Sequence, residues 1–473
     1  MILRPEIRDL ISALWREIEV LRVENAALRQ EAAELRRQLD KNSSNSSKPP
    51  SSDGLKKPPR IAGSLRGRSG KTSGGQAGHA GGTLKPAAKP DVIERREAEA
   101  CRHCLAGLTA AMVTGVEKRQ VFDLPEPRLT VIEHHAMIYR CARCRGRTTA
   151  SFPEGVISPV QYGPRARAAA VYLHVQQLVP EDRVRPGDGR PVHGAAGLCP
   201  ASVVAWGERK AEAFEPVAAR IAALVGQAPV RHLDETGFRV AGKTQWLHTA
   251  STPALTSYRV TAKRGALPKG FCGGVVVHDH FKPYFTLPGV RHGLCNAHHL
   301  RELKALTDID KEPWAGQMRD LLVEANAAVS GAVAEGAPTL PTPVLRTLIK
   351  RYNAIVRRGL AFHRSQPPLA RPIGARGPPP HRPGHNLLIR LHRFKHDVLR
   401  FLYDFAVPFT NNQAERDLRM MKVRMKISGS FRTMAGARTF ARLRSVIATA
   451  RKQGWNILQT LAANPANLIH ALA

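Results

Sequence analysis

The sequence predicts a multidomain α/β protein, and three observations support this fold class. A heptad pattern fills the first 40 residues, two CxxC pairs follow between residues 101 and 144, and four strand-like segments begin at residue 229. A length of 473 residues is enough for about three domains and at least one sizeable core. We therefore expect an N-terminal coiled coil, a zinc ribbon, and a mixed α/β catalytic core that an all-helical insertion interrupts.

The charge of the chain indicates a polyanionic partner. It has 72 Lys and Arg against 38 Asp and Glu, a formal net charge of +34. Such a surplus is usually balanced by nucleic acid phosphate. A ribosomal or membrane-surface protein is the alternative, although this length disfavours a small ribosomal protein. No apolar run approaches the roughly 18 residues of a membrane span, and the charged N-terminal helix does not resemble a signal peptide, so we expect a cytoplasmic, nucleoid-associated protein without a membrane partner.

The first segment, residues 1–40, has the pattern of a parallel two-stranded coiled coil. Two series of residues, each with a seven-residue repeat, share one face of the predicted helix. The d series is Ile7, Leu14, Leu21, Leu28 and Leu35, and the a series is Ile11, Ile18, Asn25, Ala32 and Leu39. Isoleucine at a, leucine at d and a single a-position asparagine favour a dimer in fixed register. We expect a homodimer or higher oligomer through residues 7–39, the alternative being one amphipathic helix packed on its own domain.

The second segment, residues 41–95, is predicted to be a flexible basic arm. Residues 41–90 contain ten Lys and Arg against the single Asp53, among many Ser, Gly and Pro. Such a composition cannot bury a core. The arm is suited to following a DNA backbone and becoming ordered only when bound, but an inert solvated linker explains the composition equally well.

The third segment, residues 96–155, is predicted to be a zinc ribbon. Two CxxC pairs, 36 residues apart, supply the four thiolates of a tetrahedral Zn²⁺ site, namely Cys101, Cys104, Cys141 and Cys144. The intervening segments 120–125 and 129–141 have the composition of strands. Cysteines in this pattern suit a reducing compartment better than a disulfide framework. The pattern leaves open whether the ribbon contacts DNA or only stabilises the fold.

Residues 156–227 are predicted to form a helical connector, and DNA binding is a candidate role for it. Two helical stretches, 165–179 and 202–225, flank a segment rich in Gly and Pro that is too long for the turn of a helix-turn-helix motif. The sequence of 185–197, RPGDGRPVHGAAG, changes composition abruptly, as a local reading-frame shift would. Such a shift would weaken the binding of DNA ends without touching the acids, so an active and an inactive copy are both expected alternatives.

A catalytic core is predicted to begin at 228, and its first part extends to 296. Strand-like segments at 229–238, 244–251, 255–262 and 271–280 place Asp234 and Asp279 near strand ends, where a sheet presents side chains to ligands. A third carboxylate is needed to complete two oxygen-ligand shells around hard cations. Glu415 is our candidate, because a predicted helix puts it on one face with Arg419 and Lys422. Taken singly, each acid is equally explained as a surface charge or a helix cap.

Several motifs together carry a resemblance to a known family. The arm contains KNSSNSSKPPSSDG and SGGQAGHAGG, the core contains LDETGF, HDHFKPY and HGLCNAHHLREL, and TNNQAERDLRMMKVRMKISGSFRT follows. With the CxxC pairs, these passages resemble the insertion-sequence-66 family of transposases over about residues 10–460. The resemblance implies a ribonuclease-H-like fold and a DDE active site using Mg²⁺ or Mn²⁺, in which Asp234, Asp279 and Glu415 match the three acids. One departure is Thr410, where the family often has Asp before the Asn pair.

The resemblance also implies what the protein does. A member of this family binds the terminal inverted repeats of an insertion sequence and catalyses metal-dependent cleavage and transfer of DNA strands into a target. Accessory proteins of the same element are possible further partners. Two alternatives remain: a zipper and zinc-ribbon DNA-binding regulator without catalysis, and a ribonuclease-H-like nuclease.

Residues 297–405 separate the second acid from the third and are predicted to be a helical insertion. Segments 300–312, 344–363 and 386–405 have helical periodicity. At the start of the region, Cys295 and His298 have ligand-like spacing, but only two ligands are local, so a structural role beside the active-site helix is favoured over zinc binding.

The final part of the core, residues 406–473, is predicted to combine the helix of Glu415 with basic helices. Between 416 and 452 there are eleven Lys and Arg against one acid, Asp417. We expect these side chains to contact phosphates rather than bases, although a solvated basic helix has the same pattern. The predicted DNA-binding residues are Arg416, Arg419, Lys422, Arg424 and Lys426.

Overall fold

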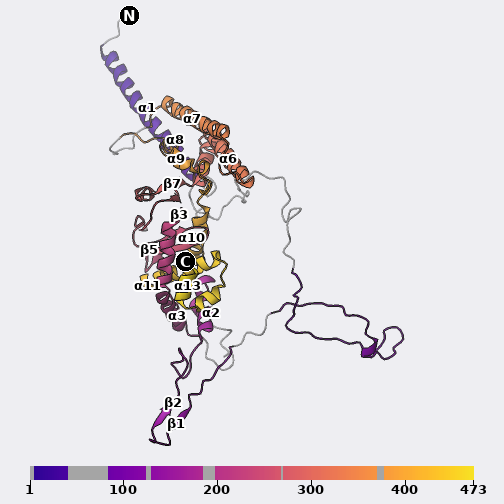
Figure 1. Cartoon of the computed structure of the whole chain (residues 1–473). Coiled ribbons are helices and arrows are strands. Elements are labelled where there is room, and N and C mark those ends of the chain that lie inside the picture. The colour runs from indigo at the N-terminus through magenta and orange to yellow at the C-terminus, as the bar shows by residue number, and fades with distance from the viewer. Residues whose placement is uncertain are drawn as a thin grey trace.

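The computed structural model describes residues 5–40, 84–123, 129–184, 198–267, 270–369 and 378–472. Most of the predicted basic arm and the irregular segment 185–197 lie outside these residues. The fold is mixed α/β, with a sheet between two groups of helices (Figure 1).

A five-stranded mixed sheet lies at the centre of the molecule, in the order β5-β4-β3-β6-β7. Its strands are β3 (Val230–Val240), β4 (Lys243–Ser251), β5 (Thr256–Thr261), β6 (Val275–His278) and β7 (Arg291–Leu294). The first three strands in sequence are antiparallel neighbours, whereas β6 runs parallel to both β3 and β7. The two edges of the sheet are therefore built differently, and β3 lies where the antiparallel and parallel parts meet.

The first four of these strands coincide with the four strand-like segments of the sequence. Ala241 and Gly242 join β3 to β4 with φ angles of 46° and 76°. Two consecutive residues with positive φ are typical of the tight hairpin turn that matches the twist of antiparallel strands. The sequence analysis missed β7, because four residues with little apolar character give no strand pattern.

One group of helices packs on the sheet and closes the main core. These helices are α2 (Pro164–Val171), α3 (Pro200–Ala213), α4 (Glu215–Gln227), α10 (Asn412–Ser428), α11 (Met434–Lys452), α12 (Ile457–Ala462) and α13 (Pro465–Ala471). Val276 of β6 faces this core, while Val275 and Val277 on the other face pack against Val407. The predicted helix 202–225 is divided at Phe214, because Pro216 enters the first turn of α4 and cannot continue the hydrogen bonding of α3.

A second group of helices forms the insertion between β7 and α10, with a core of its own. Its helices are α5 (Asn296–Asp308), α6 (Pro313–Ala334), α7 (Thr342–Ser365), α8 (Pro383–Arg393) and α9 (Lys395–Val398). Figure 1 shows α6, α7 and α8 together at the end of the molecule opposite α11 and α13. All regular elements of the described residues between β7 and α10 are helical. Helix α6 was not anticipated, since small residues such as Ala and Gly dilute its apolar periodicity.

Single-turn segments of 3-10 or π geometry link several of these elements. They are η2 (Ala110–Met112), η3 (Tyr172–Gln176), η4 (Glu181–Arg183), η6 (Lys282–Thr286) and η7 (Arg400–Leu402).

The N-terminal part of the chain is one long helix followed by a segment with little regular structure. Helix α1 spans Pro5–Asp40, and Arg37 near its end forms an ion pair of 3.0 Å with Asp310 of the insertion. Of the two strands predicted between the CxxC pairs, the segment 129–141 contains one short strand, β1 (Ile138–Arg140), which pairs with β2 (Arg147–Thr149). The segment 120–125 has no strand in its described residues, 120–123. In the part of the chain that the structure describes, no helix combines the length and apolar character needed to cross a membrane.

Candidate catalytic centre

Two of the candidate acids lie at the same level on neighbouring strands. In the parallel pairing of β3 and β6, His232 lies opposite Val277. Asp234 and Asp279 each come two residues later, Asp279 directly after the last residue of β6. The predicted neighbouring strands are therefore present, but Asp234 lies inside β3 and not at its end. The reason is that β4 pairs along almost the whole of β3, whereas β6 pairs only with its first residues.

The third acid, Glu415, is in the first turn of α10, and Asn411 at the start of that helix ties it to β3. The buried Asn411 side chain donates from Nδ2 to the carbonyl of Leu233 at 2.7 Å, and its Oδ1 lies 2.9 Å from Nδ1 of His232. These two bonds fix the start of α10 beside the strand residue that precedes Asp234. The sequence analysis did not identify Asn411 as a positioning residue.

The three acids are near enough for their charges to interact. Burial raises the pKa of Asp234 well above its usual range, and the carboxylates of Glu235, Asp279 and Glu415 raise it further. One oxygen of Asp234 accepts the backbone N–H of Glu235 at 2.8 Å, which only partly offsets this effect. Carboxylate oxygens are the ligands that hard divalent cations prefer, so these acids have the donor chemistry of such a site. Within the described residues, however, the one group of three ligands close enough to share an ion includes Glu415 but neither Asp234 nor Asp279.

Glu415 has a histidine and an arginine of α5 as neighbours. Its Oε1 lies 3.5 Å from Nε2 of His298, and its Oε2 lies 4.0 Å from a guanidinium nitrogen of Arg301. The His298 interaction lowers the pKa of Glu415, Arg301 and Arg419 lower it further, and burial opposes them. Cys295, the other half of the CxxH pair, is buried, and its sulfur accepts the backbone N–H of Asn411 at 3.1 Å. The CxxH pair thus lies directly against the helix of Glu415, where the sequence analysis expected a structural role.

Polar side chains that the sequence analysis did not single out surround the acids. Glu235, next to Asp234, pairs with Arg264 at 2.8 Å and accepts a hydrogen bond from the hydroxyl of Tyr284. Two histidines flank Asp279, and burial lowers the pKa of His278 to about 3 and that of His280 to about 4. Both imidazoles are therefore neutral near pH 7. The two histidines are next to Asp279 in the sequence, so the motif HDH could have indicated them. Nothing local in the sequence indicates that Tyr284 is a partner of Glu235.

The basic side chains predicted for DNA contact do not all reach the surface. Arg416, Arg419, Lys422 and Lys426 are exposed on α10. Arg424 is buried, and its guanidinium carbon lies 3.7 Å from the centroid of the Phe431 ring. Arg424 lies on the buried face of α10 together with Leu418 and Met421. Its guanidinium therefore packs on aromatic rings and is not available to a phosphate.

The two CxxC pairs form similar turns but do not come together. In each turn, the residue after the second cysteine has positive φ and donates to the carbonyl of the first cysteine, Leu105 to Cys101 at 2.9 Å and Arg145 to Cys141 at 2.8 Å. Backbone N–H groups lower the pKa of Cys101 and Cys141. Within the described residues, the only group of three or more potential metal ligands is found elsewhere. Side chains here are almost all exposed, so packing alone gives no force that would hold the pairs against each other.

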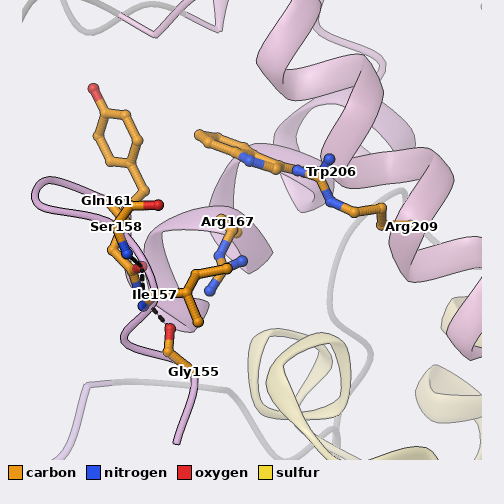
Figure 2. Close-up of a pocket in the computed structure, with 8 residues that line it drawn as sticks. Gly155, Ile157, Ser158, Gln161, Arg167, Trp206 and Arg209 are labelled. Carbon is orange, nitrogen blue, oxygen red and sulfur yellow. Dashed lines mark hydrogen bonds between the residues drawn. The ribbon is translucent and has the colours of Figure 1, made fainter. Parts of the chain in front are cut away.

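A separate pocket of about 260 Å³ lies away from the acids, between residues 155–167 and α3 (Figure 2). The edge of Tyr162 faces Trp206 with ring centroids 5.3 Å apart, and Arg167 and Arg209 complete the lining. It contains no carboxylate, so the chemistry of the chain is not centred here.

Comparisons with known proteins agree with the geometry. The family model described as Transposase IS66 family matches residues 159–439, more than half of the chain. This range includes all three acids, the CxxH pair and the helical insertion. A model for a family of unknown function, DUF6444, matches residues 2–85. No curated protein matches the chain.

Proposed function

Because the chain belongs to the IS66 transposase family, we propose that it is the DNA transposase of a bacterial insertion sequence, cutting DNA at the ends of the element and joining them to a target. Family membership makes it a nucleic-acid-processing enzyme with DNA as its partner. The observation that supports the finer proposal is that Asp234 and Asp279 lie at the same level on β3 and β6, and that the charges of Asp279 and Glu415 add to the effect of burial in raising the pKa of Asp234.

The sheet supports assigning the core to the ribonuclease-H-like fold. Three antiparallel strands are followed by two that run parallel to β3, and the first and second acids come from β3 and the end of β6. The third acid comes from a helix, α10, that follows a long insertion. In this proposal the insertion leaves the sheet intact, because it begins after β7 and ends before α10.

Asp234, Asp279 and Glu415 are proposed to hold two divalent cations, Mg²⁺ or Mn²⁺. Three carboxylates supply oxygen ligands alone, which fits these hard ions. When bound, such ions activate the attacking oxygen and stabilise the leaving oxygen of a phosphodiester. Asp234, whose pKa burial and neighbouring carboxylates raise, would act as a ligand in its ionised form. His298 and Arg301 orient the carboxylate of Glu415 from the side of α5.

The proposed reaction has two steps at one site. First, water attacks the phosphodiester at the end of the element; a new P–O bond forms, the bond to the 3′ oxygen breaks, and that oxygen leaves as a 3′-OH. Second, this 3′-OH attacks a phosphodiester of the target, forming the joint and releasing a target 3′-OH. Exposed Arg416, Arg419, Lys422 and Lys426 are proposed to hold the phosphates around the scissile bond.

The N-terminal segments are proposed to bind and pair the ends of the element. The seam of α1 presents exposed leucines such as Leu21 and Leu28, which a second copy would cover in a parallel coiled coil. The cysteine turns at 101–104 and 141–144 are proposed to close around one Zn²⁺, and the basic arm to follow the DNA backbone.

One experiment tests the proposal: incubation of the purified protein with labelled inverted-repeat DNA and Mg²⁺ or Mn²⁺, with Asp234→Ala beside the wild type. Asp320→Ala is a matched control, since the Asp320 side chain is 69% exposed on α6 of the insertion. We expect nicking and strand joining by the wild type and the control but not by Asp234→Ala. Binding without acid-dependent cleavage would favour a DNA-binding regulator, and cleavage of unrelated RNA–DNA hybrids a nuclease.

A further inference from the structure

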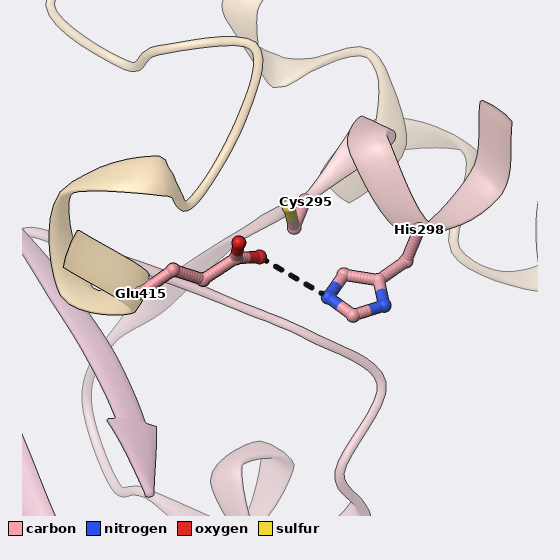
Figure 3. Close-up of side chains that lie close together, drawn as sticks. All are labelled: Cys295, His298 and Glu415. Carbon is pink, nitrogen blue, oxygen red and sulfur yellow. Dashed lines mark ion pairs between the residues drawn. The ribbon is translucent and has the colours of Figure 1, made fainter. Parts of the chain in front are cut away.

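Cys295, His298 and Glu415 bring three different ligand types to one point. Their ligand atoms all lie within 4.8 Å of one another. Figure 3 shows the imidazole of His298 and the carboxylate of Glu415 pointing toward each other, with Cys295 beside the gap between them. The sequence offered only the first two ligands, and the folding of α10 against α5 supplies the third.

Two features of this cluster fit a bound cation better than a simple ion pair. Oε1 of Glu415 is buried, yet no group in the described part of the chain completes a hydrogen bond to it, since His298 at 3.5 Å only reaches ion-pair distance. The sulfur of Cys295 accepts a backbone N–H at 3.1 Å and precedes the first turn of α5. The sulfur thus lies beside the imidazole and the carboxylate as a third ligand type. Burial raises the pKa of its thiol, so binding a cation requires loss of the thiol proton.

We propose that Cys295, His298 and Glu415 form a site for a thiophilic divalent cation such as Zn²⁺, distinct from the oxygen-ligated catalytic site but sharing Glu415 with it. One sulfur, one imidazole nitrogen and one carboxylate oxygen leave a fourth position open, as in zinc sites with three protein ligands. Mg²⁺ avoids sulfur ligands, so the two sites select different ions. When Zn²⁺ binds, the thiol proton leaves to solvent and a sulfur–zinc bond forms.

The inference rests on the proposed function, because it makes Zn²⁺ an inhibitor through a shared catalytic acid. With its carboxylate on Zn²⁺, Glu415 is withdrawn from the catalytic cations. Zn²⁺ inhibition of DNA cleavage is therefore competitive with Mg²⁺.

The test measures bound Zn²⁺ per chain in the full-length protein without DNA, at buffered free Zn²⁺. Cys295→Ser and His298→Gln are each expected to bind one Zn²⁺ fewer than the wild type, with affinity at this site weakened at least about 100-fold, since even loss of an outer-shell partner costs 10–100-fold. Cys272→Ser is the matched control, because Cys272 is an exposed free cysteine outside the cluster. Thermal melting checks that each variant folds.

Asp234→Ala separates this site from the catalytic acids. It is expected to keep the full Zn²⁺ count, because Asp234 is not a ligand of the cluster. An unchanged count in both Cys295→Ser and His298→Gln would overturn the proposal, as would loss of this Zn²⁺ in Asp234→Ala. The count needs no DNA, so failure of the transposase proposal would appear only in the cleavage assay.

A different observation, the charge pattern of α7, carries a second inference. No Asp or Glu occurs between Glu335 and Asp397. Four exposed basic residues on α7 repeat at intervals of four, seven and seven positions. They are Arg346, Lys350, Arg357 and Arg364. At 100° and 1.5 Å per residue they fall within an arc of about 40° along about 27 Å of helix.

We propose that this stripe on α7 binds the phosphate backbone of duplex DNA, which extends the DNA-binding surface onto the insertion. Two other arginines of α7 point elsewhere and have partners, Arg351 at 2.6 Å from Glu324 and Arg358 at 2.8 Å from Gln317. The stripe is long enough to follow about eight base pairs of duplex. It rests on the proposed function only in taking DNA as the partner.

Two double variants with the same loss of charge on the same helix test the stripe. Affinity for generic duplex DNA is measured against salt concentration, without a divalent cation. Each phosphate contact contributes about 0.9 to the magnitude of the slope of log K against log salt. For Arg357→Gln/Arg364→Gln, which removes two such contacts, this magnitude should decrease by about 1.8. Arg351→Gln/Arg358→Gln should change it by much less. Equal effects of the two pairs would overturn the proposal, and cleavage activity plays no part in the readout.

Discussion

Replacing Asn411 with alanine tests how the third acid is held in place. The Asn411 side chain is 3% exposed and makes two hydrogen bonds to β3, with Nδ1 of His232 at 2.9 Å and with the carbonyl of Leu233 at 2.7 Å. Alanine removes both bonds and leaves His232 and the Leu233 carbonyl buried without these partners. Each such loss costs about 1–3 kcal/mol, so we expect the free energy of unfolding of the core to fall by about 2–6 kcal/mol.

The same substitution should also reduce activity, because Glu415 lies one turn after Asn411. A shift of about 1 Å in a positioned catalytic group can lower a rate about 100-fold. We expect a loss of that order in the cleavage of inverted-repeat DNA at saturating Mg²⁺. Unfolding in urea and the cleavage rate are both compared with those of Asn412→Ala, since Asn412 is exposed on the same turn. If Asn411→Ala matched this control within about 0.5 kcal/mol and about threefold in rate, the positioning argument would be refuted.

Three further predictions concern the acids, the basic helix and the coiled coil. Burial and neighbouring carboxylates raise the pKa of Asp234, so the folded protein retains a proton that the unfolded chain has lost. The free energy of unfolding of the metal-free protein should therefore fall as pH rises above the ordinary pKa range of aspartate, and in urea titrations Asp234→Asn should remove that fall. Lys422→Gln should lower the salt slope of DNA binding by about 1, whereas Arg424→Met, at a buried position, should alter thermal stability and leave the slope unchanged. Leu21→Asp should convert the dimer to monomer in sedimentation, while Val23→Asp, outside the seam but equally apolar and 64% exposed, should not.

The sequence identified the strands of the core because their patterns are local. The segment around Val275–His278 is a short apolar run after two glycines. β5 and the second half of β3 alternate between buried and more accessible positions, whereas β4 is continuously buried over its last five residues. The long helices α1 and α7 were equally visible through their periodicity. By contrast, β7 and α6 have weak patterns, and their conformation depends on the neighbours against which they pack.

For the candidate site, too, the sequence indicates the residues through local motifs but not their arrangement in space. Asp234, Asp279 and Glu415 stand in recognisable motifs, but their distance in space depends on the pairing of β3 with β6 and on the docking of α10. Arg424 shows the limit of a charge count: its spacing from Leu418 and Met421 puts it on the buried stripe, and aromatic rings of Phe431 and Phe440 accept its guanidinium. Helical position therefore outweighs residue type in deciding which cations face solvent.

The two groups around Glu415 place opposite demands on its carboxylate. In the proposed catalytic site Asp234 and Asp279 would share a hard cation with Glu415, while Arg301 supplies positive charge and His298 a ring nitrogen from the side of α5. A carboxylate held only by the first group would be repelled by its fellow acids when no cation is present. The interaction with α5 lowers the pKa of Glu415 and so keeps it ionised in that state. The start of α5 thus stabilises the ionised form of Glu415 when no cation is present, and in the proposed Zn²⁺ site the same contact with His298 and Cys295 supplies the ligands that would compete for it.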